Sequence, residues 1–154
     1  MIIIALFFTL AVSQSFSDEG DNEVHLANNL QQVSQQAKEE KLPVLLFFAS
    51  TECEFCEMLE EDHLASMAHA PSYKDKVIIR KVNIDDYDYL QDFSGSKISA
   101  DEFSDRFSIR VTPTLVFLDH KGNQLGKKML GYNRSDFFSI YLDEAIDKAK
   151  TLIQ

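Results

Sequence analysis

A pair of cysteines soon after an apolar run is the feature that most constrains the fold of this chain. The run covers residues 44–48 (VLLFF), and Cys53 and Cys56 follow it with Glu54 and Phe55 between them. A buried strand that leads into C-x-x-C at the beginning of a helix is a typical place for a redox-active dithiol. The helix N-terminus favours a thiolate there, because its unpaired N–H groups and its dipole stabilise negative charge. The chain has two cysteines in all, so any intramolecular disulfide joins these two.

Length and composition predict a single domain with a proper core. The chain has 154 residues, of which 45% are hydrophobic and twelve are phenylalanines. Its formal net charge of −10 argues against nucleic acid as a partner, because phosphate contacts need a basic patch. We expect no nucleotide or flavin cofactor, since the sequence has no Gly-rich phosphate-binding loop.

The N-terminus predicts export. Residues 1–12 are uncharged and almost all apolar, which is too short for a bilayer span of about 20 residues but fits a secretory signal. Small residues at Ala11 and Ser13 predict cleavage after Ser13, so we assign 1–17 to a signal peptide and 18–154 to the folded domain. A buried N-terminal strand is the alternative, because no Lys or Arg precedes the run. Export implies an oxidising compartment, which is the periplasm in a bacterium or the outside of the cell.

Hydrophobic spacing predicts the order α-β-α-β-α-β-β-α. The helices are expected at residues 22–40, from the C-x-x-C to Ala70, at 100–107 and at 136–152, and the strands at 44–49, 77–85, 115–119 and 124–130. In the first helix, Leu26, Leu30, Val33 and Ala37 recur at three- and four-residue spacing.

Turn and cap residues set the limits of the other segments. Residues 86–99 are polar and aromatic, and we expect them to form an inserted or short surface loop. Ser99 with Glu102 forms an expected capping box, and Ser135 is expected to cap the last helix. Alternating helices and strands with a central parallel pair need helices on both faces of the sheet. We therefore expect an α/β fold of three layers around a central mixed sheet.

Three segments together resemble the thioredoxin fold. They are the strand and C-x-x-C at 44–56, the KVNID sequence at 81–85, and the FSIRVTPTLVF sequence at 107–117. A Gly-Tyr pair at 131–132 also fits, and the similarity covers roughly residues 25–150. Within the thioredoxin-like superfamily the chain looks most like the exported, sulfur-oxidation-associated (SoxW-like) group.

The resemblance implies roles for the residues of these segments. Cys53 is expected to be the exposed nucleophile and Cys56 the resolving cysteine, which attacks the mixed disulfide. Pro113 is expected to be cis and to lie beside the dithiol, so that the Thr112 backbone can pair with an incoming peptide. An ordinary trans-proline at a strand edge is the alternative. Phe55 is expected to be partly exposed beside Cys53 and to contact a protein substrate.

The chain departs from the thioredoxin pattern around the dithiol. Glu52 stands in place of the usual tryptophan, and Glu54 and Phe55 replace a Gly-Pro pair. Phe47 occupies the position of a buried aspartate that helps to move the resolving cysteine's proton, so water or another carboxylate must take that role. Lys81, the second half of that buried pair, is retained.

Acidic residues crowd the cysteines and bear on the direction of electron flow. Glu52, Glu54 and Glu57 disfavour a thiolate, because like charges repel. We expect the pKa of Cys53 to be less depressed than in strongly oxidising relatives, and therefore a comparatively reducing pair. The alternative is that these glutamates point into solvent and are screened.

Two other interpretations concern the C-x-x-C itself. Cys53, Cys56, His63 and His69 superficially match zinc-ligand spacing, but one helix would place His63 about 10 Å beyond Cys56 along its axis, so we expect no metal. The bridge could also be purely structural in a non-catalytic binding module, although so small a loop gains little from closure.

The sequence favours a thiol–disulfide oxidoreductase that reduces protein disulfides. A dithiol oxidase remains open, whereas an isomerase would need a dimerisation segment that we do not find. The expected partners are a protein disulfide substrate and an upstream thiol electron donor, which could be embedded in a membrane, and the protein is expected to be a monomer. Tyr87, Tyr89 and Phe93 form either a partner-binding rim or packing beneath a loop.

Overall fold

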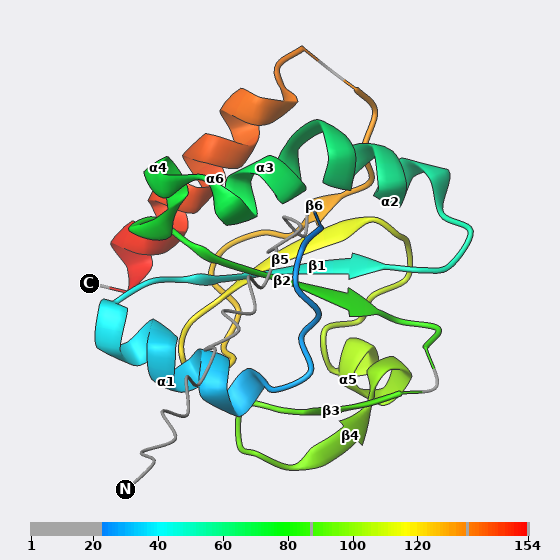
Figure 1. Ribbon diagram of the computed structural model, residues 1–154, viewed down its shortest axis with the longest axis vertical. Helices are drawn as coiled ribbons and strands as arrows, with labels where there is room; N and C mark the ends of the chain where they lie inside the picture. Colours follow the sequence, from blue (N-terminus) through cyan, green and yellow to red (C-terminus); the bar gives the residue numbers. More distant parts are fainter. Residues whose placement is uncertain (1–22, 87, 135, 154) are drawn as a thin grey trace, which may run out of the picture.

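The computed structural model describes residues 23–86, 88–134 and 136–153 (Figure 1). The expected signal peptide at 1–17, with its cleavage after Ser13, lies outside these residues, as do Tyr87 and Ser135. Among the described residues, no helix combines the length and the apolar character that crossing a membrane requires.

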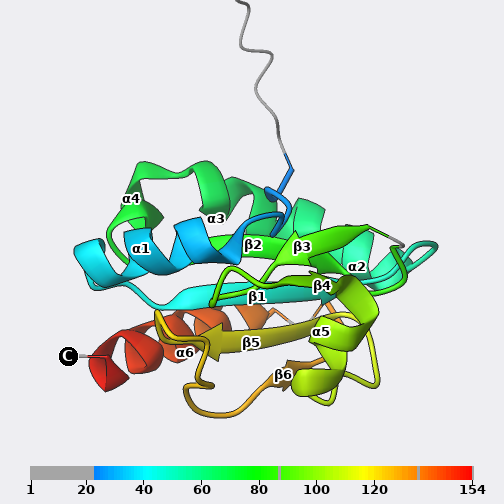
Figure 2. The same cartoon turned by 90° about the horizontal axis from the view of Figure 1, so that it is seen from below.

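A mixed sheet forms the centre of the domain, with the strand order β2-β1-β5-β6 (Figure 2). β1 (Val44–Ala49) pairs in parallel with β2 (Ile78–Asn83) and antiparallel with β5 (Thr114–Leu118). The short β6 (Met129–Leu130) pairs antiparallel with β5. Every residue of β1 is buried, as expected for a strand covered on both faces.

Helices cover both faces of the sheet, which confirms the expected three-layer α/β arrangement. Figure 1 shows the sheet between α2, α3 and α6 on one side and α1 and α5 on the other. Alternate residues of β1 serve the two cores, with Leu45 and Phe47 on the α2 side and Leu46 and Phe48 on the α1 side. The helix bounds are Leu30–Glu40 (α1), Glu54–Leu59 (α2), Ala65–His69 (α3), Ala100–Arg106 (α5) and Phe138–Leu152 (α6).

The helix that follows the C-x-x-C ends at His69, one residue before the predicted end at Ala70. It is continuous through α2, a π-helical segment η1 (Glu60–Leu64) and α3, and Ala70 leaves the helical conformation. Pro71 then begins a short helix, α4 (Pro71–Lys74), because a proline is tolerated in the first turn of a helix. A π-helical turn inside an α-helix is rare and frequently marks a functional site.

The first helix is shorter than predicted. Helix α1 begins at Leu30 rather than at residue 22, because the Asn29 side chain accepts a hydrogen bond from the Gln32 N–H and caps it. Leu26, which matches the helical spacing, is 47% exposed and lies outside the helix.

The residues before α1 instead extend along the edge of the sheet. Leu26 pairs in parallel with Lys81 of β2 as an isolated bridge. The Ala27 N–H donates to the Lys81 carbonyl at 2.8 Å, and the Lys81 N–H donates to the His25 carbonyl at 2.9 Å. We call residues 23–29 the N-terminal strap. Backbone hydrogen bonds to the edge strand outweigh the helical pattern of the side chains here.

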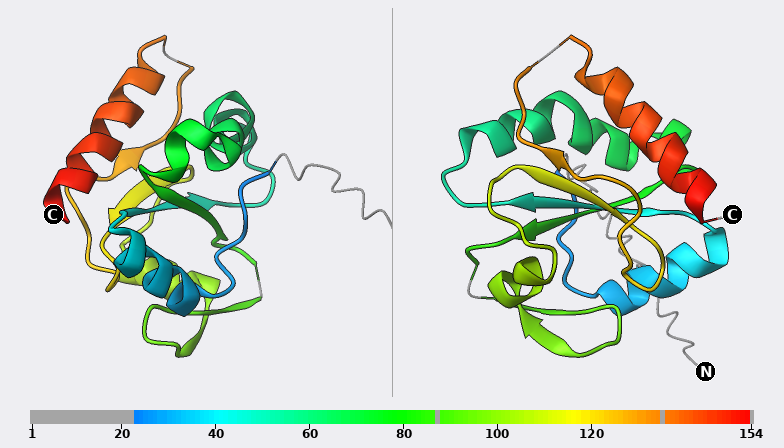
Figure 3. Two further views of the ribbon diagram at one scale, coloured as in Figure 1. Left: turned by 60° about the vertical axis from the view of Figure 1, so that its left-hand side comes forward. Right: turned by 180° about the vertical axis from the view of Figure 1, so that it is seen from behind.

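The predicted surface loop at 86–99 contains a β-hairpin. β3 (Tyr89–Gln91) pairs antiparallel with β4 (Lys97–Ser99), and the hairpin lies beside α1 and α5 (Figure 3). Ser99 takes the N-cap position of α5, but its side chain makes no capping bond to the helix, so the capping box is wrong. Its hydroxyl hydrogen-bonds the Asp101 carboxylate instead, which lowers the pKa of that group.

In the C-terminal third, the bounds of the last strand and the last helix differ from the prediction. The expected return strand at 124–130 is reduced to β6 and one bridge between Leu118 and Gln124. Helix α6 begins at Phe138, and its buried residues are Phe138, Leu142, Ile146 and Ala149. Tyr141 and Leu152 of the same helix are exposed.

Candidate active site

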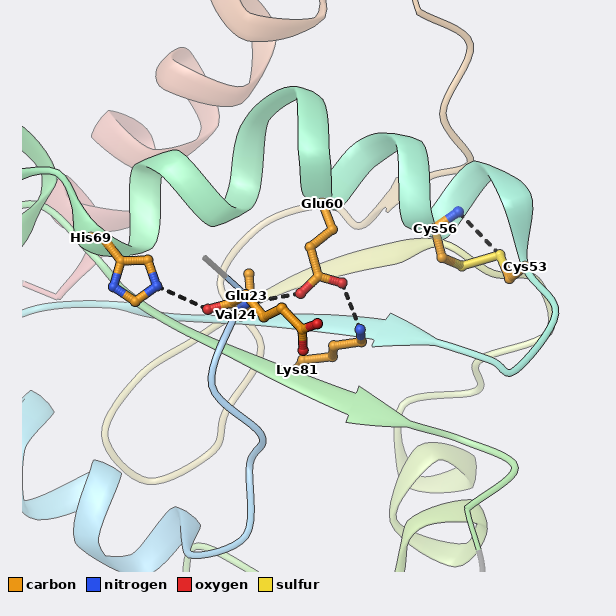
Figure 4. A network of polar contacts seen from close by, with 7 residues as sticks. All are labelled: Glu23, Val24, Cys53, Cys56, Glu60, His69 and Lys81. Atoms are coloured by element: carbon orange, nitrogen blue, oxygen red, sulfur yellow. Dashed lines mark hydrogen bonds and ion pairs between the residues drawn. A yellow bond between two sulfur atoms is a disulfide. The ribbon is translucent and has the colours of Figure 1, made fainter. Parts of the chain in front are cut away.

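The two cysteines lie where β1 leads into α2, and they form a disulfide (Figure 4). Cys53 is the N-cap residue of α2, and its sulfur accepts a hydrogen bond from the Cys56 N–H at 3.2 Å. The S–S distance is 2.06 Å. Cys56 is 3% exposed whereas Cys53 is partly exposed. An attacking thiol from outside therefore has better access to the sulfur of Cys53.

A hydrogen-bonded loop positions the first cysteine. The Thr51 N–H and hydroxyl both donate to the Asp85 carboxylate, which follows β2. These bonds, led by the one from the Thr51 hydroxyl, lower the pKa of Asp85. Glu52 follows with a φ of 55°, in the left-handed region, which is uncommon for a residue other than glycine. The end of β2 thus fixes the turn that presents Cys53.

The segment before β5 contributes a second side of the site. The Thr112–Pro113 peptide bond is cis, and Pro113 is buried. The hydroxyls of Thr112 and Ser50 lie 2.8 Å apart, so that this segment is joined to the loop before the C-x-x-C. The Gly131 N–H donates to the Pro113 carbonyl at 2.8 Å, which joins the proline to the segment after β6. The hydrogen-bond partner of the Thr112 hydroxyl is therefore Ser50.

Two apolar side chains are exposed on the segments that carry the dithiol and the cis-proline. Phe55, between the cysteines, is 52% exposed, and Val111, before Thr112, is 51% exposed. Large apolar groups that remain exposed on a folded surface are available for contact with a partner.

Between the continuous helix α2–η1–α3 and β2 lies an ion pair of a buried glutamate and a partly buried lysine, of which the sequence identified only the lysine. Lys81 donates to the Glu60 carboxylate at 2.5 Å, and the Val24 N–H of the N-terminal strap donates to the other oxygen at 2.9 Å (Figure 4). The Lys81 amino group also lies 5.8 Å from the ring centre of Phe47. Glu60 is 8% exposed, so this carboxylate, on a different element, partners the retained lysine.

A sequence signal for Glu60 did exist. It lies four residues after Cys56 and four before Leu64, so the three share one helical face. Cys56 and Leu64 are buried, and an acidic residue between them on an apolar face needs a buried partner. Which group that partner would be depends on the strand beneath the helix, and the sequence alone does not specify it.

The histidines of the zinc interpretation have other partners. His63 lies 3.1 Å from the hydroxyl of Tyr132, which donates to Asp62 at 2.8 Å. Burial, followed by the bond to Asp62, raises the pKa of Tyr132 to about 12. The ring of His69 hydrogen-bonds the Glu23 carbonyl at 2.9 Å. No group of three or more His, Cys, Asp or Glu that could hold a metal ion is found in the described part of the chain.

The remaining predicted residues differ in exposure and in position. Glu52, Glu54 and Glu57 are all exposed beside the cysteines. Tyr89 is exposed on the hairpin, with the Lys97 amino group 4.3 Å from its ring centre, whereas Phe93 packs against the core on the α1 side. The structure therefore separates these two aromatic residues into one surface and one packing position.

Comparison with known proteins agrees with this architecture. A family model described as a thioredoxin-like domain matches residues 30–146. Mitochondrial thioredoxin 3 from Saccharomyces cerevisiae is similar in structure, with a TM-score of 0.54, 20% identity, and coverage of 80% of this chain and 93% of that one. Fasciola hepatica thioredoxin gives a TM-score of 0.55 at 17% identity, with coverage of 82% and 99%.

A thioredoxin-fold protein from Helicobacter pylori gives a TM-score of 0.52 at 22% identity, with coverage of 72% of this chain and 81% of that one. The search of curated proteins found no match. At these identities the structural likeness establishes the fold alone.

Proposed function

The chain belongs to the thioredoxin-like domain family, and we propose that it is a thiol–disulfide oxidoreductase that reduces protein disulfides. The observation that carries this proposal is the pair of cysteines at the start of α2, with Cys53 accessible and Cys56 buried behind it. A disulfide with one accessible sulfur at a helix N-terminus suits exchange better than it suits a structural role.

The order of the reaction steps follows from the exposure of Cys53 and the burial of Cys56. In the reduced protein the Cys53 thiolate attacks one sulfur of a substrate disulfide, and the other substrate sulfur leaves as a thiolate. Cys56 then loses its proton and attacks the Cys53 sulfur, which releases the second substrate thiolate. The protein dithiol has then lost two electrons and the substrate disulfide has gained them. An upstream dithiol must reduce the Cys53–Cys56 bridge again before the next cycle.

The substrate would bind against the cis-proline segment. We propose that an extended peptide pairs with the backbone at Thr112, beside Pro113, while Phe55 and Val111 contact its side chains. This placement is supported by the exposure of both apolar groups and by the Ser50–Thr112 bond, which joins this segment to the loop before Cys53.

The acidic rim supports the reducing direction. Glu52, Glu54 and Glu57 disfavour the Cys53 thiolate, and a less stable thiolate makes the disulfide a weaker oxidant. A dithiol oxidase would use the same geometry in the opposite direction, so the reduction potential distinguishes the two activities.

The cellular setting is part of the proposal and is supported by sequence alone. We propose that the apolar N-terminus exports the protein to the periplasm or out of the cell, where it works as a monomer. There it would receive electrons from an upstream thiol donor that could be embedded in the membrane.

The aspartate-aromatic segment before α5 and the T-P-T-x-x-F-x-D-x-x-G sequence at 112–122 support a place in the SoxW-like group.

Reduction of insulin in the presence of dithiothreitol tests the activity. We expect the wild-type protein to accelerate the precipitation of the insulin chains and the Cys53→Ser variant to show only the background rate. When it is reduced, freed of dithiothreitol and then mixed with insulin, the Cys56→Ser variant should accumulate a mixed disulfide. A wild-type protein that gives only the background rate would contradict the proposal and leave the structural bridge as the function of the cysteines.

A further inference from the structure

We propose that Glu60 accepts the proton of Cys56 when Cys56 attacks the mixed disulfide, and that Lys81 and the Val24 N–H hold it in place for this step. The inference rests on the proposed exchange activity and assigns a group to its second half. Cys53 is partly exposed and can release its proton to water, but Cys56 is 3% exposed and packed in the α2-side core. A proton acceptor for Cys56 therefore has to come from within the protein.

The helix places the two side chains side by side. The Glu60 N–H donates to the Cys56 carbonyl, so the residues lie one helical turn apart on the same face. Residues at this spacing have Cβ atoms about 5–6 Å apart, so the two side chains are neighbours, and a direct or water-mediated proton transfer between them is part of the proposal. Figure 4 shows both side chains directed from the helix toward the sheet.

The carboxylate is held but not saturated. Its two oxygens accept from the Val24 N–H and from Lys81, while an ionised carboxylate has about four lone-pair positions. The N-terminal strap closes this side, because Val24 is buried and the backbone on both sides of it is bonded to His69 and Lys81. Glu60 can thus take up a proton without losing both of its partners.

Other titratable groups around the pair are less well placed. Lys81 faces Glu60 from β2 and carries the positive charge. His69 on α3 hydrogen-bonds the Glu23 carbonyl of the strap and packs edge-on against His25. Phe47 lies directly opposite Lys81 in the β1–β2 register, so β1 contributes no acid at this point.

The step balances as a proton transfer followed by exchange. The Cys56 thiol gives its proton to the Glu60 carboxylate, and the resulting Cys56 thiolate attacks the Cys53 sulfur. The bond between Cys53 and the substrate sulfur breaks as the Cys53–Cys56 bond forms. The departing substrate thiolate recovers a proton, and Glu60 returns to the carboxylate form. Positioned proton transfer of this kind typically contributes about 10²–10⁴-fold to a rate.

Rapid mixing of the reduced, full-length protein with Ellman's reagent separates the two halves of the reaction. Attack by Cys53 releases the first coloured thionitrobenzoate, and attack by Cys56 on the mixed disulfide releases the second. At pH about 7 we expect Glu60→Gln to slow the second release by about 100-fold and to leave the first within about twofold. Glu61→Gln, a change of the same kind at the adjacent exposed position, should leave both releases unchanged.

The pH profile distinguishes proton acceptance from a structural role. An ordinary thiol ionises near pH about 8.5, so at pH about 9.5 Cys56 needs less help and the deficit of Glu60→Gln should shrink to less than about tenfold. A packing defect would slow the reaction at both pH values. A second release that is unchanged in Glu60→Gln, or a deficit that is equal at both pH values, would overturn the inference.

A second variant keeps the test valid if Glu60→Gln folds poorly. The double variant Glu60→Leu/Lys81→Met replaces the buried pair with apolar groups, a change that is often neutral for stability, and it should show the same slow second release. If the wild-type protein releases no thionitrobenzoate at all, the proposed exchange activity itself fails. If it releases both equivalents and the double variant does so equally fast, only the role of Glu60 fails.

Discussion

Two buried carboxylates, one on each side of the sheet, have very different surroundings. Asp92, at the turn of the β3–β4 hairpin, accepts from the Ser94 N–H and hydroxyl, from the Ser96 N–H and from Arg106. Burial by itself raises the pKa of Asp92, but these hydrogen bonds outweigh it and bring the value to about 2. Asp92 therefore stays charged, and its role is to hold the hairpin turn.

Glu60 stands at the end of α2, where η1 begins, and its carboxylate is held by fewer donors. The described residues give its carboxylate one lysine and one backbone N–H, and its neighbour on the helix is Cys56. The comparison shows that burial alone does not decide what a carboxylate does. A carboxylate whose lone pairs all accept hydrogen bonds stabilises the fold. A carboxylate that keeps free lone pairs beside a buried thiol can exchange a proton.

Removing the lysine partner of Glu60 should give the largest change. We expect Lys81→Met to lower the free energy of unfolding by about 3 kcal/mol, because the Glu60 charge is left buried without its counterion. Urea unfolding of the reduced and the oxidised protein measures this loss. Lys74→Met, at an exposed position, is the control and should change stability by less than about 0.5 kcal/mol. A stability equal to that of the wild type would mean that the pair contributes nothing.

Asp92→Asn should separate the two regions. We expect it to lower the free energy of unfolding by about 2 kcal/mol, because the single oxygen of an amide cannot accept from Arg106 and from the Ser94 and Ser96 donors at the same time. The rates of both thionitrobenzoate releases should remain those of the wild type. Asp88→Asn, at an exposed position just before β3, is the matched control. A slowed second release in Asp92→Asn would show that the two regions are coupled, and the comparison would fail.

Strong acid should remove the contribution of Asp92 to stability. The folded-state pKa of Asp92 is about 2, below its ordinary value of 3.8, so its contribution is present above pH 3.8 and is lost as the pH falls toward about 2. We expect the wild-type protein to lose stability over this interval more steeply than Asp92→Asn. Thermal melts at several pH values in this range measure the two slopes, and parallel slopes would be inconsistent with a charged Asp92.

The exposed glutamates should give the smallest effect. Changing Glu52, Glu54 and Glu57 together to glutamine should raise the reduction potential of the dithiol by about 10–20 mV, because removal of the negative charges stabilises the Cys53 thiolate at the helix N-terminus. The shift should decrease at high salt, since exposed charges are screened. A potential that moves in the opposite direction would contradict the electrostatic argument for a reducing pair.

The sequence predicts the layers of this fold well and its edges less well. The apolar run of β1, the strand that contains KVN of the KVNID sequence and the helix after Cys53 all follow from hydrophobic patterns and turn residues within their own segments. The N-terminal strap was predicted to be helical, because the spacing of Leu26 fits a helix. In the structure, the backbone on both sides of Leu26 forms hydrogen bonds with β2 instead. Those bonds depend on a strand more than fifty residues away, which local patterns do not report.

The same limit applies to the site. The two cysteines, Pro113 and Lys81 stand in sequence motifs, so the sequence could single them out. Glu60 stands in no motif quoted from the sequence, and its pairing with Lys81 depends on how the helix lies over β2. The absence of an acid at Phe47 indicated that water or another carboxylate must take its role, but only the fold shows which carboxylate faces Lys81.

The reduction potential of the Cys53–Cys56 pair is the most direct test of the central proposal. The protein would be equilibrated with glutathione buffers of known potential, and its free thiols would be mass-tagged and counted. We predict a potential at or below about −230 mV, in the range of reducing thioredoxins and glutaredoxins. A value near about −120 mV, typical of a strong oxidant, would contradict the proposed direction, and a pair that never exchanges would contradict the proposed activity.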